Sequence, residues 1–177
     1  MKREAPIETQ LKGWDGRSTD WLRALARSLP EDEGTISALL AGAKSPMRQV
    51  SVGSTWILKQ FQDAGMTFDA DQTRSLIHLL REVSEPEGVL HLLQILGRLE
   101  LPGSGVTELW RRLLLLSEHR NTFVRAFAFG ALYHAADRHA ALRPRCAEHL
   151  TEALLREPAS VRARIRNAAK KSSWFPL

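Results

Sequence analysis

The stretch NTFVRAFAFGALYHAADRH, residues 121–139, decides the fold. Its apolar residues recur three and four positions apart, at Val124, Phe127, Ala128, Ala131, Leu132 and Ala135. Three to four residues make one helical turn, so this spacing gathers them on one face of an α-helix. The stretch therefore predicts an amphipathic helix that buries a face of small and branched side chains.

The same pattern returns elsewhere in the chain. PASVRARIRNAAKK, residues 158–171, repeats it 37 positions later, and SPMRQVSVGSTW, residues 45–56, superposes on TFVRAFAFGALY without a gap. PEGVLHLLQILGRL, from residue 86, repeats it more weakly, with Leu90 where the others have arginine. The candidate structural repeat positions are Met47, Arg48, Val89, Val124, Arg125, Ala131, Val161, Arg162 and Ala168. The anchor positions 47, 89, 124 and 161 are 42, 35 and 37 residues apart, a period typical of α-solenoids built from helix pairs.

The rest of the chain is also helical in pattern, and no stretch alternates as a strand does. Proline, glycine and polar clusters cut it into short pieces. Nine helices are predicted, at about 19–29, 34–43, 46–63, 71–83, 86–99, 105–117, 121–137, 143–156 and 159–171. The fold class predicted is all-α.

The valine–arginine–alanine pattern that opens a first helix, followed by a second amphipathic helix such as RPRCAEHLTEALLRE, resembles a HEAT repeat. The resemblance covers most of residues 45–171 and implies a right-handed α-α superhelix, an α-solenoid of about four to five hairpins with a concave binding face. We expect an N-terminal extension at 1–18, a single repeat domain at 19–171 and an apolar tail at 172–177. Within that domain the repeats are expected at 19–43, 45–83, 86–117 and 121–156, with a half repeat at 158–171.

Two features of the repeat have a structural interpretation. Small residues at equivalent repeat positions are expected to let adjacent helices approach closely, namely Ala126, Ala131, Ala163 and Ala168. The arginine after the valine is expected to be a ladder arginine, which bonds carbonyls or an acidic group at the turn of the adjacent repeat, as in HEAT-like proteins. This interpretation applies to Arg48, Arg125 and Arg162.

Length and composition indicate an ordinary folded domain. The chain has 177 residues, of which 44% are hydrophobic and 25% charged, enough to bury a core without cross-links. The one cysteine, Cys146, cannot form an internal disulfide, which favours a reducing compartment. No apolar run is long enough to span a membrane and the first residues lack an apolar signal region, so we expect a cytoplasmic protein without membrane insertion.

Charge is unevenly distributed along the chain. Residues 1–118 carry a net charge of −2, and residues 119–177 carry +7. Arg162, Arg166 and Lys170 are four residues apart and share one helix face, where like charges repel. This basic face is either a solvated helix end or a surface for an anionic partner. The candidate anion-binding or partner-binding residues are Arg143, Arg145, Arg162, Arg164, Arg166, Lys170 and Lys171.

The sequence contains no pattern typical of catalysis, so the protein is not expected to be an enzyme, and no cofactor or metal is expected. Its histidines have no metal-ligand spacing, and there is no phosphate-binding loop or nucleophile elbow. The HEAT-like DNA glycosylases pair tryptophans with a catalytic aspartate. Trp21, Trp56 and Trp110 have no acidic residue four positions on, and Trp110 is expected in the core.

The function expected is a non-enzymatic protein–protein interaction module or adaptor. Its candidate surface is the concave face, made by the second helices 71–83, 105–117 and 143–156. The alternative is a nucleic-acid-binding protein that uses the basic C-terminal helices. The tail KKSSWFPL either folds back on the repeats or docks into a partner or a second copy. The sequence leaves the partner and the oligomeric state open.

Overall fold

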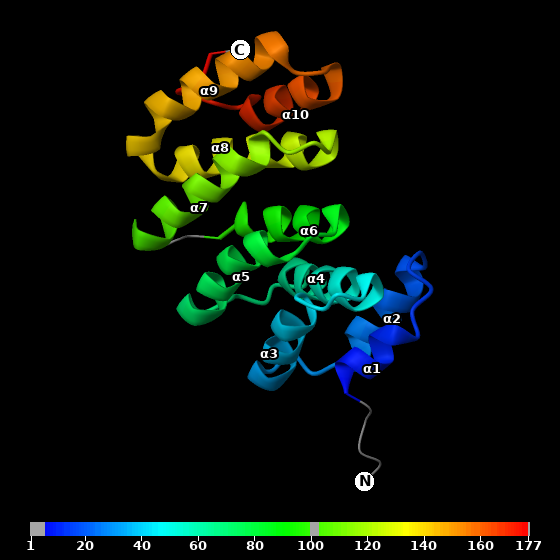
Figure 1. Ribbon diagram of the computed structural model, residues 1–177. Coiled ribbons are helices and arrows are strands. Elements are labelled where there is room, and N and C mark those ends of the chain that lie inside the picture. Colours follow the sequence, from blue (N-terminus) through cyan, green and yellow to red (C-terminus); the bar gives the residue numbers. More distant parts are fainter. Residues whose placement is uncertain (1–5, 100–102, 177) are drawn as a thin grey trace. The chain divides into compact units, whose positions relative to one another are not determined.

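The computed structural model describes residues 6–99 and 103–176 (Figure 1). Within these ranges the chain forms ten α-helices and one short 3-10 helix, with no strand, so the all-α prediction is confirmed for them. The helices are α1 Ile7–Lys12, α2 Thr19–Ser28, α3 Glu33–Gly42, α4 Arg48–Asp63, α5 Ala70–Glu82, α6 Pro86–Leu96, α7 Gly103–Ser117, α8 Thr122–Arg138, η1 Ala140–Leu142, α9 Arg143–Arg156 and α10 Ala159–Ala169. In these parts of the chain no helix is long and apolar enough to cross a membrane.

The chain divides into two compact units, Met1–Ile95 and Leu96–Leu177. The nine predicted helices are all present, with ends that differ by at most three residues. The tenth helix, α1, falls in the predicted extension at 1–18, and its Leu11 is fully buried. Six residues are too few to show an apolar period, so this helix could not be predicted from its spacing.

Several helices of the first unit begin at a side chain that caps free backbone N–H groups. Ser18 accepts from the backbone of Trp21, and Asp32 accepts from the backbone of Thr35. Asp69 forms a full capping box before α5. Such caps each contribute about 1 kcal/mol and fix where a helix starts, which explains how closely the polar clusters of the sequence predicted the boundaries.

Gly53 of α4 packs closely against side chains of α1 and α2. A Cβ placed on Gly53 would lie 2.6 Å from Cδ2 of Leu11 and 3.4 Å from Cδ2 of Leu22. Gly130, the equivalent position in α8, has room, because the nearest heavy atom to its Cβ position would be Nε of Arg164 at 3.6 Å.

The two glycines predict opposite effects of the same substitution. Gly53→Ala is expected to lower the free energy of unfolding by about 1–2 kcal/mol, since Leu11 must move. Gly130→Ala is expected to raise it by up to about 1 kcal/mol, because alanine is the better helix former and meets no obstacle. Urea denaturation of both variants measures the difference, and an equal effect at both positions would contradict the packing described for Gly53.

His91 of α6 links its helix to α4 in the first unit. Oγ1 of Thr55 lies 3.0 Å from the carbonyl of Val52 in its own helix and 3.1 Å from Nδ1 of His91. Because the single hydroxyl hydrogen is directed to the helix carbonyl, we assign the ring hydrogen to Nδ1, which donates to Thr55. Burial, with the charge of Lys59 as a smaller cause, lowers the pKa of His91 from 6.5 to about 4.

This lowered pKa predicts a pH-dependent stability. Between pH 6.5 and 4 the unfolded chain binds a proton at His91 that the folded chain does not, so stability falls as the pH decreases. The contribution reaches about 1.4 kcal/mol per pH unit in that window and is constant above it. Denaturation at several pH values should show a shallower slope for His91→Gln than for the native chain, and equal slopes would contradict the prediction.

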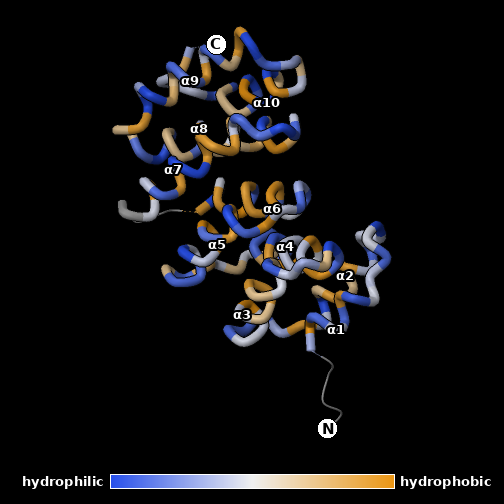
Figure 2. Tube along the Cα trace, in the orientation of Figure 1, coloured by the Kyte–Doolittle hydropathy of each residue, from blue (hydrophilic) through white to orange (hydrophobic). Residues whose placement is uncertain are grey.

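In the second unit, α8 packs on α10 through the branched residues that the repeat pattern identified. Val124, Val161 and Ile165 are fully buried, and Ala131 is buried. Figure 2 shows hydrophobic residues along both helices. The expectation that α8 buries only one face is wrong, because the consecutive residues 128–133 are all buried and so the middle of the helix is enclosed on every side. Ala168 is half-buried.

One expectation about the seams is wrong. Ala163 was expected among the close-packed alanines, but it is exposed, because the buried stripe of α10 runs through Val161, Ile165 and Ala169 and leaves Ala163 on the far side. Met47, aligned with the buried Val124, precedes the first turn of α4 as its N-cap and is 36% exposed.

Arg125 makes the contact that the ladder interpretation expects. Its Nε lies 3.0 and 3.2 Å from the two carboxylate oxygens of Glu157, at the turn before α10. One Nη donates to the carbonyls of His119 and Arg120, at the turn before α8. The side chains of Arg125 and Glu157 are each only 18% exposed, so this ion pair is largely enclosed.

Arg48 occupies the corresponding place in the first unit. Its guanidinium donates to Oε1 of Glu87 at 2.6 Å and pairs with Glu85 at 3.7 Å, both at the start of α6. It also donates to the carbonyl of Gly16 at 3.3 Å. In both units, therefore, a ladder arginine joins backbone carbonyls to an acidic group where a following first helix begins.

The described part of the tail, through residue 176, folds back onto α8. The ring of Trp174 stacks on Tyr133 at 5.2 Å between centroids, and its Nε1 donates to Oδ1 of Asp137 at 2.9 Å. The next residue, Phe175, is only 4% exposed. Of the two roles considered for the tail, the structure shows the first, in which the tail folds back, here onto α8.

Candidate functional site

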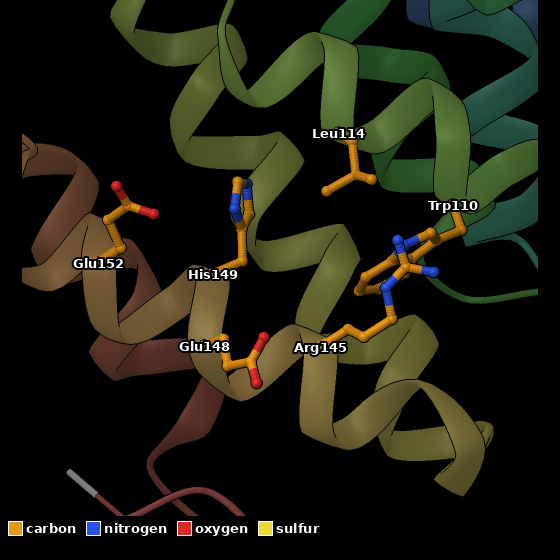
Figure 3. Close-up of a pocket in the computed structure, with 6 residues that line it drawn as sticks. All are labelled: Trp110, Leu114, Arg145, Glu148, His149 and Glu152. Atoms are coloured by element: carbon orange, nitrogen blue, oxygen red, sulfur yellow. The ribbon is translucent and has the colours of Figure 1, made fainter.

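The candidate site is a groove along α9 in the second unit, which we call the α9 groove. Its larger hollow has a volume of about 210 Å³ (Figure 3). The lining residues are Trp110 and Leu114 of α7 and Arg145, Glu148, His149 and Glu152 of α9. Both helices belong to the predicted concave surface, and the third predicted helix, α5, lies in the other unit.

The spacing of the α9 residues explains why they face one hollow. Arg145, Glu148, His149 and Glu152 are separated by three, four and seven positions, which is one stripe of a helix. The neighbouring stripe, Cys146, Leu150 and Ala153, is buried and fixes the rotation of the helix. Figure 3 shows the polar stripe on α9 and the two α7 side chains opposite it.

A second hollow of about 170 Å³ continues the groove, and His149 and Glu152 line both. Its other lining residues are Glu118, Phe129, Ala153, Arg156 and Glu157. Two of the acidic groups are neutralised, because Glu152 pairs with Arg156 and Glu157 pairs with Arg125. Glu118 and Glu148 form no ion pair with any described residue, so each hollow has one unpaired carboxylate, and that of Glu148 shares its hollow with Arg145.

His149 of α9 joins its helix to α7 at the groove. Its Nε2 lies 2.9 Å from Oγ of Ser117, which itself donates to the carbonyl of Leu114 at 2.7 Å. The serine hydrogen is thus already used, so we assign the ring hydrogen to Nε2, donating to Ser117, and leave Nδ1 as an acceptor. Phe129 lies against the ring at 5.4 Å. This arrangement fixes α9 to α7 and gives the groove a rigid base.

Trp110 is buried, as the sequence predicted, and it also forms one wall of the groove. Its indole Nε1–H is enclosed and has no acceptor among the described residues. A buried N–H without an acceptor is costly, and most such groups in folded proteins are paired. Trp110 therefore supplies both an apolar wall and an unused donor.

The seven predicted anion-binding residues do not behave as one set. Arg143 donates to the carbonyls of Ala136 and Asp137 and lies over the ring of Trp174, and Arg164 lies 3.8 Å from the ring centre of Phe127. Burial lowers the pKa of Arg164. These two arginines are therefore occupied by contacts within the unit.

The other predicted cations differ in their surroundings. Arg145 lines the α9 groove, and Arg162 is half-buried on α10. Three are exposed and form no ion pair with any described residue, namely Arg166, Lys170 and Lys171. These three could therefore pair with an anionic partner, whereas Arg143 and Arg164 would first have to give up their contacts within the unit.

The described residues provide little for catalysis. None of them forms a group of three or more histidine, cysteine or acidic side chains placed to hold a metal. Burial raises the pKa of the Cys146 thiol to about 12, so this cysteine is not the thiolate that a nucleophile must be. Ser117, beside His149, is 2% exposed, which leaves no room for a substrate to reach its hydroxyl.

Sequence reasoning missed Glu148, His149 and Glu152 as a set. It noted Glu148 and His149 only as neighbours that point in different directions. The sequence does show a polar stripe on this helix beside its apolar one. Helix faces that only contact solvent have the same spacing, so the stripe alone does not indicate a binding site. Comparison with protein-family models, with curated proteins and with solved structures finds no match to this chain.

Proposed function

We propose that the protein is a non-enzymatic adaptor, a HEAT-like α-solenoid that binds another protein through the α9 groove. The observation that carries the proposal is that second helices of two successive predicted hairpins, α7 and α9, line one groove. In HEAT-like proteins the second helices form the concave, macromolecule-binding face. The two ladder pairs, Arg48 with Glu87 and Arg125 with Glu157, support the repeat arrangement.

The size and chemistry of the groove favour protein side chains over a cofactor. Its larger hollow, about 210 Å³, is smaller than the roughly 300–1,000 Å³ of pockets that enclose drug-sized ligands. Its lining combines an apolar wall at Trp110 with carboxylates, a guanidinium and an imidazole. Such a mixture suits one or two side chains of a partner, with a polar rim around a small apolar centre.

A photo-crosslinking residue placed in the groove tests this function. Benzoylphenylalanine at position 148, introduced in the cells that produce the protein, is expected to give one discrete adduct with a second protein. The same residue at position 27, on the exposed face of α2, serves as the control and is expected to give none. A nucleic-acid adduct at 148, or the same adducts at both positions, would contradict the proposal.

Nucleic acid has less support as a partner, because Arg143 and Arg164 are engaged within the unit. We expect labelled single-stranded and double-stranded oligonucleotides to bind the native protein only at low salt. Binding should weaken by about 0.9 log units per log unit of salt for each duplex phosphate contacted. Fluorescence anisotropy measures this, with Arg162, Arg166 and Lys170 changed together to Glu as the control. Micromolar binding that survives physiological salt and vanishes in this control would favour nucleic acid instead.

A further inference from the structure

The three arginines at the same repeat position do not have the same surroundings. Arg125 uses its Nε to hold both carboxylate oxygens of Glu157, and Arg48 pairs with Glu85 and Glu87. In each case the acid comes from the start of a following first helix. Arg162 is the third member, on α10, and no described residue supplies its acid.

The unpartnered atom of Arg162 is the one that its counterpart uses. Nε of Arg162 is enclosed and has no hydrogen-bond acceptor among the described residues. Nε of Arg125 is the atom that binds Glu157. Arg162 is half-buried at the same repeat position, and its Nε lacks the carboxylate that Nε of Arg125 binds.

The surroundings of Arg162 define what would complete it. Arg166 and Lys170 continue its helix face one and two turns further on, both exposed and without an ion pair to any described residue. No acidic residue lies within α10, so this face carries cations without compensation. Charge complementarity thus calls for an occupant with several carboxylates, one of which must reach the enclosed Nε.

We propose that α10 binds an acidic segment of a protein partner, in which an Asp or Glu at the start of a helix binds Arg162 as Glu157 binds Arg125. Arg166 and Lys170 pair with further acidic residues of the same segment. The carboxylate binds Nε of Arg162 with both of its oxygens, the arrangement that Glu157 and Nε of Arg125 show. This inference rests on the proposed function in assuming a protein partner, but it assigns that partner to a surface other than the α9 groove.

A displayed library of random 16-residue peptides, selected on the native protein, tests the proposal. Selected peptides are then measured by fluorescence anisotropy against the native chain, Arg162→Gln, Arg162→Lys and Arg27→Gln. Arg27 is the matched control, because it is an exposed helical arginine without an ion pair to any described residue. Circular dichroism confirms that each variant is folded. Since Arg162 has no hydrogen-bond or ion-pair partner among the described residues, its replacement should leave the helix content unchanged.

We expect the selected peptides to be rich in Asp and Glu. Arg162→Gln should weaken them by at least about tenfold, as expected for loss of one partner of an enclosed ion pair. Arg162→Lys should weaken them as well, since lysine keeps the charge but has no Nε fork. Arg27→Gln should change the affinity by no more than about twofold.

Other outcomes would overturn the inference. Equal affinity of the selected peptides for the Arg162→Gln variant and the native chain would overturn it. Selected peptides without acidic residues would also overturn it. If peptides whose binding does not depend on Arg162 bound the Glu148→Lys variant more weakly than the native chain, the proposed function at the α9 groove would stand. Only the inference about α10 would then be overturned. A selection that returned no peptide would overturn the inference about α10, whereas the proposed function would still be decided by crosslinking at position 148.

Discussion

Replacing Arg125 with methionine is expected to lower the free energy of unfolding by about 3 kcal/mol. The substitution leaves Glu157 in an enclosed place without its cation, and removing one partner of such a pair costs more than the pair itself contributes. It also removes the donor to the carbonyls of His119 and Arg120. Urea denaturation followed by circular dichroism measures the change.

A double-mutant cycle with Glu157→Gln isolates the pair, and a coupling of at least about 1 kcal/mol is expected. Arg162→Met provides the matched comparison at the equivalent repeat position. Because Arg162 has no acid among the described residues, its replacement should change the stability by less than about 0.5 kcal/mol or raise it. Equal losses for Arg125→Met and Arg162→Met would show that the two arginines do not differ as described.

Replacing Phe175 with alanine is expected to cost about 3 kcal/mol, the second large effect. Phe175 is 4% exposed, and Trp174 beside it stacks on Tyr133. Deleting residues 172–177 should therefore lower the melting temperature by at least as much as Phe175→Ala does. Differential scanning calorimetry of both variants measures the effect.

Leu155→Ala is the control for the tail, because Leu155 is 80% exposed and its truncation should change stability by less than about 0.5 kcal/mol. Association measured alongside stability distinguishes the two roles considered for the tail. If the deletion removed a self-association and left the melting temperature unchanged, the tail would be a docking segment and not a cover.

The repeat pattern predicted much of the fold because its signals are local and periodic. Val124, Val161 and the residues one turn away follow helical spacing, and such spacing determines which face is buried whatever packs against it. Caps such as Asp32 and Asn121 then determine where the helices start. Alignment alone did not predict burial at Met47, which matches Val124 in register but lies before the first turn of its helix.

The candidate site was less accessible from the sequence because it depends on contacts between distant residues. Ser117 and His149 are 32 positions apart, and nothing in either local sequence indicates that they meet. The sequence alone does not distinguish the seven predicted cations from one another. The structure separates Arg143 and Arg164, which lie over aromatic rings, from Arg166 and the lysines, which face solvent. The ladder interpretation agreed with the contacts of Arg48 and Arg125, because it rested on a repeated position and not on composition. It did not anticipate that Nε of Arg162 has no acceptor among the described residues.

We propose, from the HEAT-like resemblance alone, that the hairpins stack into a curved rod, and small-angle X-ray scattering of the native chain tests this proposal. A compact domain of this length would have a radius of gyration of about 16 Å. A curved rod should give a clearly larger value, with the skewed distance distribution of an elongated particle. A value near that of the compact domain, with a symmetric distribution, would contradict it.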